Sequence, residues 1–186
     1  MLLSCGGHDS SVDPQAEDIC ACSPTAPATS DYRHAAKHVP LPSGTPNEIT
    51  VDTILGWPDG EPAFDAPRTG RELELFHIAR AFLQFAWVRP SDCDITMEVS
   101  RTPDRNAPRV IVETSVDSEY CSSRRSLQQQ LASLGEQVNK KSGELKQPRP
   151  VDVLGLAFQD FDHDRGSAQV ATSWELHPAI VKLLPQ

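Results

Sequence analysis

Residues 93–99 have the sequence CDITMEV, in which polar and apolar side chains alternate. Alternation with a period of two is typical of a β-strand that buries one face, here the face of its odd-numbered apolar residues. Residues 109–114, RVIVET, have the same character and follow a turn rich in proline, aspartate and asparagine. The two stretches therefore predict a β-hairpin whose polar face carries Asp94 and Glu98.

Downstream of the hairpin the pattern becomes helical. Ser122 or Ser123 can cap the start of the helix, and Gly135 either weakens it or ends it. The apolar face of this helix consists of Leu127, Leu131, Leu134 and Val138. After two prolines, the apolar run 151–158 predicts a buried strand, and a last strand is expected over residues 174–184.

The stretch before the hairpin, residues 71–88, is rich in aromatic and aliphatic side chains and fits two structures. One set of its apolar residues has helical spacing, whereas residues 71–75 alternate as in a strand. We interpret the whole stretch as one long, strongly bent strand, because the first strand of the barrel proposed below is long and coiled.

The elements then follow the order strand, strand, strand, helix, strand, strand. A five-stranded barrel of the oligonucleotide/oligosaccharide-binding type, the OB-fold, has this order, with its helix between the third and fourth strands. We therefore expect a mainly β chain in which residues 69–186 form an OB-like barrel. The main competing fold is a two-layer α+β sandwich.

The first 68 residues differ from the rest in composition and charge. They hold nine of the sixteen prolines and carry ten acidic against three basic residues, so they account for most of the net charge of −9. We predict that residues 1–46 are a flexible, acidic, Pro- and Ser-rich linker and that residues 47–68 dock on the barrel. The acidic balance disfavours nucleic acid as a partner, because such a chain gains no affinity from counterion release.

The cysteines and the first residues bear on the compartment. Residues 1–5, MLLSC, match the end of a bacterial lipoprotein signal, in which the cysteine, here Cys5, is lipidated. Either the true start lies further upstream, or the match is chance. Cys93 and Cys121 flank the predicted hairpin, so we expect a Cys93–Cys121 disulfide in an oxidising, extracytoplasmic compartment. The sequence contains no run of about 18 apolar residues, so we expect no transmembrane segment and a membrane contact only through a lipid anchor.

The hairpin strands, Phe161-Asp162-His163 and the closing Trp174-Glu175-Leu176-His177-Pro178 form a set of motifs across roughly residues 70–184. This set resembles a family of uncharacterised bacterial secreted or lipid-anchored proteins that end in a Trp-Glu-Ile-His-Pro motif. The resemblance implies an OB-like fold, similar in outline to staphylococcal-nuclease domains, and brings no established activity. This chain departs from the family at Thr96, where the family has a histidine, and at His163, which directly follows its aspartate.

The polar residues of these motifs form the candidate site. Because alternate side chains of a strand share a face, six residues can converge if the strands meet in a barrel: Asp94, Glu98, Glu113, His163, Glu175 and His177. Carboxylates and imidazoles together can bind a divalent metal such as Zn²⁺, Mn²⁺ or Mg²⁺, or act as general acid and base near neutral pH. The alternatives are a purely structural polar network and, around His163, a loose calcium loop.

Three functions are compatible with the sequence. We favour an exported, non-enzymatic OB-like binding or structural module of the bacterial cell envelope that needs no cofactor. The second function is a metal-dependent hydrolase, related in chemistry to nucleases or phosphodiesterases, that uses His163, Glu175 and His177 with Asp94 or Glu98. The third is a subunit of a larger extracellular assembly, suggested by the apolar patch within residues 47–57.

Overall fold

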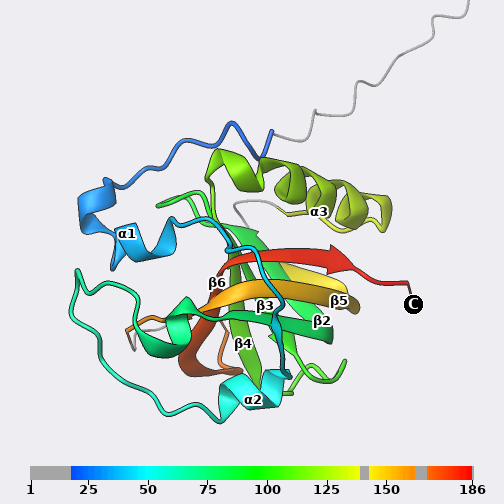
Figure 1. Cartoon of the computed structure of the whole chain (residues 1–186). Helices are drawn as coiled ribbons and strands as arrows, with labels where there is room; N and C mark the ends of the chain where they lie inside the picture. The colour runs from blue at the N-terminus through cyan, green and yellow to red at the C-terminus, as the bar shows by residue number, and fades with distance from the viewer. Residues whose placement is uncertain (1–17, 139–142, 162–166, 186) are drawn as a thin grey trace, which may run out of the picture.

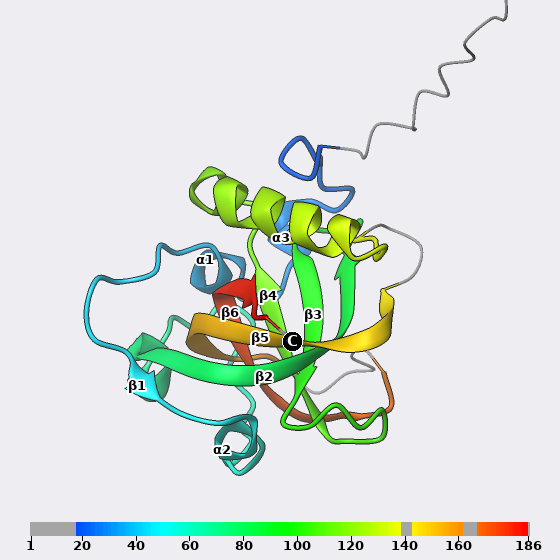
Figure 2. The same ribbon diagram turned by 90° about the vertical axis from the view of Figure 1, so that its right-hand side faces the viewer.

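The strands of this protein close into a barrel. The computed structural model describes residues 18–138, 143–161 and 167–185. The barrel strands are β2 (Leu75–Val88), β3 (Ile95–Ser100), β4 (Arg109–Thr114), β5 (Glu144–Gln159) and β6 (Val170–Leu183). They are hydrogen-bonded in the order β2-β3-β4-β6-β5, and pairing of β5 with β2 closes the ring (Figures 1 and 2). β4 and β6 run parallel and the other barrel pairs antiparallel. The predicted mainly β, five-stranded barrel, with a helix between its third and fourth strands, is confirmed.

The long strand β2 makes this closure possible. It pairs with β5 between Leu75 and Phe85 and with β3 between Phe82 and Val88, so it belongs to both edges of the unrolled sheet. Both pairings shift register just before Phe85, and such irregularities bend a strand. The strand interpretation of this stretch is thus confirmed from Leu75 onward, whereas Gly70–Leu73 form a short 3-10 helix, η2.

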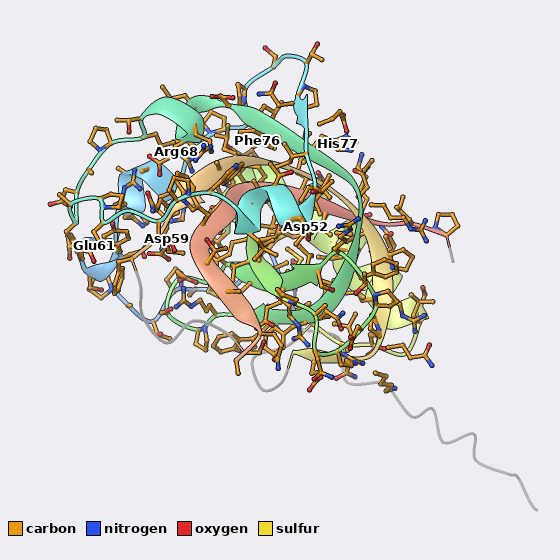
Figure 3. All side chains as sticks on the ribbon, turned by 90° about the horizontal axis from the view of Figure 1, so that it is seen from below. Asp52, Asp59, Glu61, Arg68, Phe76 and His77 are labelled. Atoms are coloured by element: carbon orange, nitrogen blue, oxygen red, sulfur yellow. A yellow bond between two sulfur atoms is a disulfide. The ribbon has the colours of Figure 1, made fainter. Side chains whose placement is uncertain are left out.

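Apolar side chains fill the barrel, and two helices close its ends. α2 (Val51–Leu55) contributes Val51 and Ile54 to the core, and α3 (Cys121–Ser133) contributes Leu127 and Leu131. Figure 1 shows the two helices on opposite ends of the barrel, and Figure 3 looks into the barrel from the end where α2 carries Asp52. A short strand, β1 (Asn47–Glu48), precedes α2 and pairs in parallel with β2.

The helix α3 begins at Cys121, slightly before the predicted serine caps, and follows the 3-10 turn η3 (Ser118–Tyr120). It ends at Ser133, because Gly135 adopts the left-handed conformation that is typical of a residue just beyond a helix. Of the two readings of Gly135, the structure therefore supports the one in which it ends the helix. Val138 consequently lies beyond the helix, although it still packs on the core.

Residues 18–46, which we call the N-terminal segment, lie against the outer face of the barrel. The sequence instead predicts a flexible linker for this stretch. They include η1 (Ala28–Ser30) and α1 (His34–Lys37), and Tyr32 packs with Phe158 of β5. Arg33 is buried and donates two hydrogen bonds, of 2.7 and 2.8 Å, to the carboxylate of Glu72. A few long-range contacts hold this segment in place, which explains why no periodic pattern predicted its order. Residues 1–17, with the lipidation candidate Cys5, lie outside the described part of the chain.

Two disulfides attach the N-terminal segment to the barrel. They join Cys20 to Cys121 and Cys22 to Cys93, with Cα–Cα distances of 5.5 and 5.9 Å. The predicted Cys93–Cys121 disulfide is therefore wrong. Cys93 and Cys121 both lie near the start of α3, because Arg124 of that helix donates to the Cys93 carbonyl at 2.7 Å. The N-terminal segment passes the same place and supplies a cysteine partner for each of them.

Candidate functional site

Polar side chains on the outer face of the barrel form a buried cluster. The alternation of β4 and β6 directs Glu113, Glu175 and His177 away from the apolar interior, and Asp94 precedes β3 nearby. We call these four residues the His177 cluster. Each is at most 2% exposed, and the ring of His38, from the N-terminal segment, lies 6.5 Å from the ring of His177.

Carboxylates surround the imidazole of His177 on both sides. Its Nδ1 lies 3.0 Å from an oxygen of Glu113 and 3.3 Å from an oxygen of Glu175. Its Nε2 lies 3.2 Å from Asp94 Oδ2, a charge contact without the alignment of a hydrogen bond. Burial alone lowers the pKa of His177, but the three carboxylates outweigh burial and raise this pKa well above its usual value of 6.5.

Neighbouring groups orient the carboxylates of the cluster. Thr96 donates to Glu113 Oε1 at 2.6 Å, and the backbone N–H of Val116 donates to Asp94 Oδ1 at 2.7 Å. Burial raises the pKa of Glu113, but its hydrogen bond to His177 and the charge of that ring hold this pKa well below 4.5. Glu113 and His177 are therefore an ionised pair at neutral pH.

Two further cations balance the negative charge of the cluster. Arg89 lies 3.9 Å from Glu113 Oε1. Burial lowers the pKa of Lys37, but the charges of Asp160, Glu113 and Glu175 outweigh it and raise this pKa above 10.5. Because Lys37 and Arg89 also line the pocket described below, the cluster and the pocket share these two charges.

The His177 cluster could hold a metal ion, since Asp94, Glu113 and His177 offer ligand atoms within 4.8 Å of one another. A metal would have to displace the proton of His177 and the contacts that these side chains already make. With exposures of 0 to 2%, the ligand atoms are also closed to a substrate from solution. We therefore interpret the His177 cluster as an internal ionic network, which links strands of the barrel and attracts the N-terminal segment.

The structure brings together four of the six predicted site residues. Glu98 is not among them, because it lies four residues beyond Asp94, where it pairs with Arg109 at 2.8 Å and accepts from the backbone N–H of Ser167 at 2.7 Å. His163 lies outside the described residues.

A pocket of about 460 Å³ adjoins the cluster, between the N-terminal segment and loops of the barrel. Three aromatic residues contribute to its wall, with the ring of Tyr32 4.8 Å from that of Phe161 and 5.8 Å from that of Phe64. Phe64 and Phe161 expose 48% and 39% of their surface. A pocket of this size with aromatic walls has the dimensions of a small-molecule site.

The pocket wall also contains charged residues. The described residues that line it include four carboxylates, two permanent cations and two histidines, namely Asp31, Asp92, Asp117, Asp160, Lys37, Arg89, His34 and His38. Burial and the neighbouring carboxylates Glu113 and Asp94 raise the pKa of Asp92 to about 6. Burial also opposes ionisation of Asp31, but Lys37 and His34 outweigh it and lower the pKa of that carboxyl. The wall therefore carries excess negative charge near neutral pH.

The two histidines of the pocket, His34 and His38, are not among the predicted site residues, because they lie in the stretch predicted to be a linker. A signal was present, since Asp31, His34 and His38 are spaced three and four residues apart, as on one face of a helix. His34 Nδ1 lies 3.0 Å from Asp31 Oδ2, and the two imidazole rings lie 4.0 Å apart. His38 Nδ1 lies 2.9 Å from Asp117 Oδ2.

No family model, curated protein or solved structure matches this chain. Within the described residues, none of the helices has both the length and the apolar character needed to cross a membrane.

Proposed function

We propose that this chain is an exported binding module of the OB-fold type, and that its ligand site is the pocket between the N-terminal segment and the barrel. One observation carries this proposal: a pocket of about 460 Å³ whose wall combines exposed aromatic rings with carboxylates. Pockets of roughly 300–1,000 Å³ with a few convergent polar groups are typical of small-ligand sites. The His177 cluster supports the pocket because its carboxylates keep Lys37 and Arg89, which also line the pocket, positively charged and in place.

The chemistry of the wall favours a small cation as the ligand. Four carboxylates outnumber the two permanent cations among the described lining residues, so the field in the pocket attracts positive charge. Aromatic faces add to this attraction, because the negative face of a ring binds ammonium and guanidinium groups. The rings of Tyr32, Phe64 and Phe161 supply such faces beside Asp31 and Asp160.

Export is supported by the two disulfides, which persist in oxidising compartments. The resemblance to secreted or lipid-anchored proteins agrees with it, and lipidation of Cys5 would then attach the module to a membrane. Alkylation and mass spectrometry of protein from its native cells should find the four paired cysteines oxidised. Four free thiols in native protein would contradict export.

A matched set of probes tests the pocket. We expect phenethylammonium to bind in ligand-observed NMR, whereas the neutral 2-phenylethanol and the anionic 3-phenylpropionate bind at least tenfold more weakly. The Ala28→Trp variant should lose this binding, because Ala28 is an exposed residue of the pocket wall that a bulky side chain would fill. Ala132→Trp, on the exposed face of α3, is the control and should bind as the parent does. Equal binding of all three probes, or full binding to Ala28→Trp, would contradict the proposed site.

A metal-dependent hydrolase is the second candidate, favoured by the ligand atoms of Asp94, Glu113 and His177 within 4.8 Å of one another. It requires the N-terminal segment to move, since the cluster is buried beneath it. Hydrolysis of a phosphodiester such as bis(4-nitrophenyl) phosphate with Mn²⁺ or Zn²⁺, lost in His177→Gln, would place this function ahead of the binding module.

A further inference from the structure

We propose that Asp31, His34 and His38 form a binding site for a divalent transition-metal ion in the wall of the pocket. This inference rests on the proposed function and deepens it, because it names one cation for which the pocket is built. The three residues are separate from the His177 cluster and come from 31–38 of the N-terminal segment.

The spacing of these residues places their ligand atoms together. Asp31 precedes α1, His34 opens it and His38 follows it, so the three side chains gather on one side of a helical turn. Each offers a ligand atom within 4.8 Å of the other two. Two imidazoles and a carboxylate are a common ligand set for a first-row transition metal, with coordination positions left open for another ligand. All three residues line the pocket.

The strongest indication is the environment of His38. Its Nδ1 lies 2.9 Å from Asp117 Oδ2 and 3.0 Å from the hydroxyl of Ser115, so these groups hold the ring proton on Nδ1. Its Nε2 is buried and has no hydrogen-bond partner among the described residues. Histidines at metal sites typically donate one ring N–H to a carboxylate and bind the metal through the lone pair of the other nitrogen. His38 has this arrangement, with Nδ1 toward the carboxylate and Nε2 free for a metal.

Metal binding requires a small local change. In a tetrahedral site with metal–nitrogen distances of 2.0–2.1 Å, the ligand atoms lie about 3.3 Å apart. Side-chain rotations that move the ligand atoms by roughly 1 Å are therefore enough to form the site. The ion would take the place of the proton shared by His34 and Asp31, and that proton would leave to solvent. Because imidazole binds Zn²⁺, Ni²⁺ and Cu²⁺ well and Mg²⁺ or Ca²⁺ poorly, the site should select transition metals.

Isothermal titration of the full chain with Zn²⁺ tests this site. The Cys5→Ser background removes a thiol that would compete for the metal, and the four other cysteines are in disulfides. We expect one Zn²⁺ per chain and at least tenfold weaker binding in His34→Ala, a variant that should fold because this side chain is 39% exposed. Asp117→Asn should keep one site and weaken it by about 10- to 100-fold, as loss of a carboxylate behind a ligating histidine does.

His77 provides the matched control. It also lies between two carboxylates, 2.7 Å from Glu48 and 2.7 Å from Asp152. It belongs to β2 (Figure 3) and is not among the described residues that line the pocket. His77→Ala should bind Zn²⁺ as the parent does. Unchanged affinity in His34→Ala, or equal competition by Mg²⁺, would overturn the metal site.

The organic probe separates this inference from the proposed function. Phenethylammonium binding is measured again with a chelator present, so that the pocket is metal-free. If the probe binds and Zn²⁺ does not, the metal site is wrong and the pocket function stands. If Zn²⁺ binds through His34 and the probe does not bind, the metal site stands and the organic-cation function is wrong.

Discussion

Two of the clusters of histidine and carboxylate among the described residues differ in their access to solvent. In the His177 cluster, three carboxylates lie within 3.3 Å of the ring nitrogens of a fully buried histidine. In the pocket cluster of Asp31, His34 and His38, the side chains are 13 to 39% exposed, and Nε2 of His38 has no partner among the described residues. The same residue types therefore form an internal ion network in one place and a partly exposed ligand set in the other.

This difference shows that the number of polar residues is a poor guide to a functional site. A buried charge contributes to structure when its partners surround it, and removing one partner leaves the others unpaired in a poorly solvated interior. A ligand site instead needs a group that is held in place and still has one free coordination position. His177 meets the first condition, and His38 meets the second.

The largest expected effect comes from removing the central group of the buried cluster. His177→Ala leaves Asp94, Glu113 and Glu175 without their shared cation, so it should lower the free energy of unfolding by about 3–5 kcal/mol. Urea unfolding measures this change. His34→Ala, in the exposed cluster, should change the same free energy by no more than about 0.5 kcal/mol. Similar losses in both variants would show that the two clusters do not differ as described.

The pH dependence of stability should also come from the buried cluster. The raised pKa of His177 stabilises the fold fully below pH 6.5, and this contribution is lost as the pH rises through the folded-state value. The lowered pKa of Glu113 stabilises the fold above pH 4.5, and this contribution is lost as the pH falls through its folded-state value. Stability should therefore be greatest between pH 4.5 and 6.5, where both contributions are complete.

Urea midpoints across the pH range check this profile. Glu113→Gln should reduce the loss of stability at both low and high pH. It removes one titrating group and also one of the carboxylates that raise the pKa of His177. Glu119→Gln replaces an exposed glutamate of η3, the turn that precedes α3, and should leave the profile unchanged. A profile that is the same in the parent and in Glu113→Gln would contradict the assignment.

The sequence predicts the buried cluster better than the pocket, and the reason is physical. Period-two alternation directs Glu175 and His177 to one face of a strand, and the element order then brings that face beside Glu113. The N-terminal segment has no such period, since its order depends on two disulfides and on Arg33, whose partner Glu72 is 39 residues away. Contacts of this kind leave no local pattern, so a segment rich in proline and serine looked like a linker.

The smallest expected effect lies where the two clusters meet. Asp92 lines the pocket and is close enough to Glu113 and Asp94 that burial and these charges raise its pKa to about 6. Ionised Asp92 therefore opposes folding above that pH, and Asp92→Asn should raise the free energy of unfolding at pH 8 by about 1 kcal/mol. The gain should vanish below pH 3.8, where the carboxyl is protonated in both states.

Asp59→Asn is the matched control for this last variant. Asp59 accepts from the hydroxyl of Ser173 at 2.7 Å, and this hydrogen bond lowers its pKa. Its replacement should therefore destabilise the fold slightly at pH 8, the opposite sign to Asp92→Asn. If Asp92→Asn also destabilises the fold, the repulsion between the buried cluster and the pocket is weaker than the attraction of Asp92 to Arg89, 3.7 Å away. The pocket would then be less negative than proposed, and its preference for cations should fall with it.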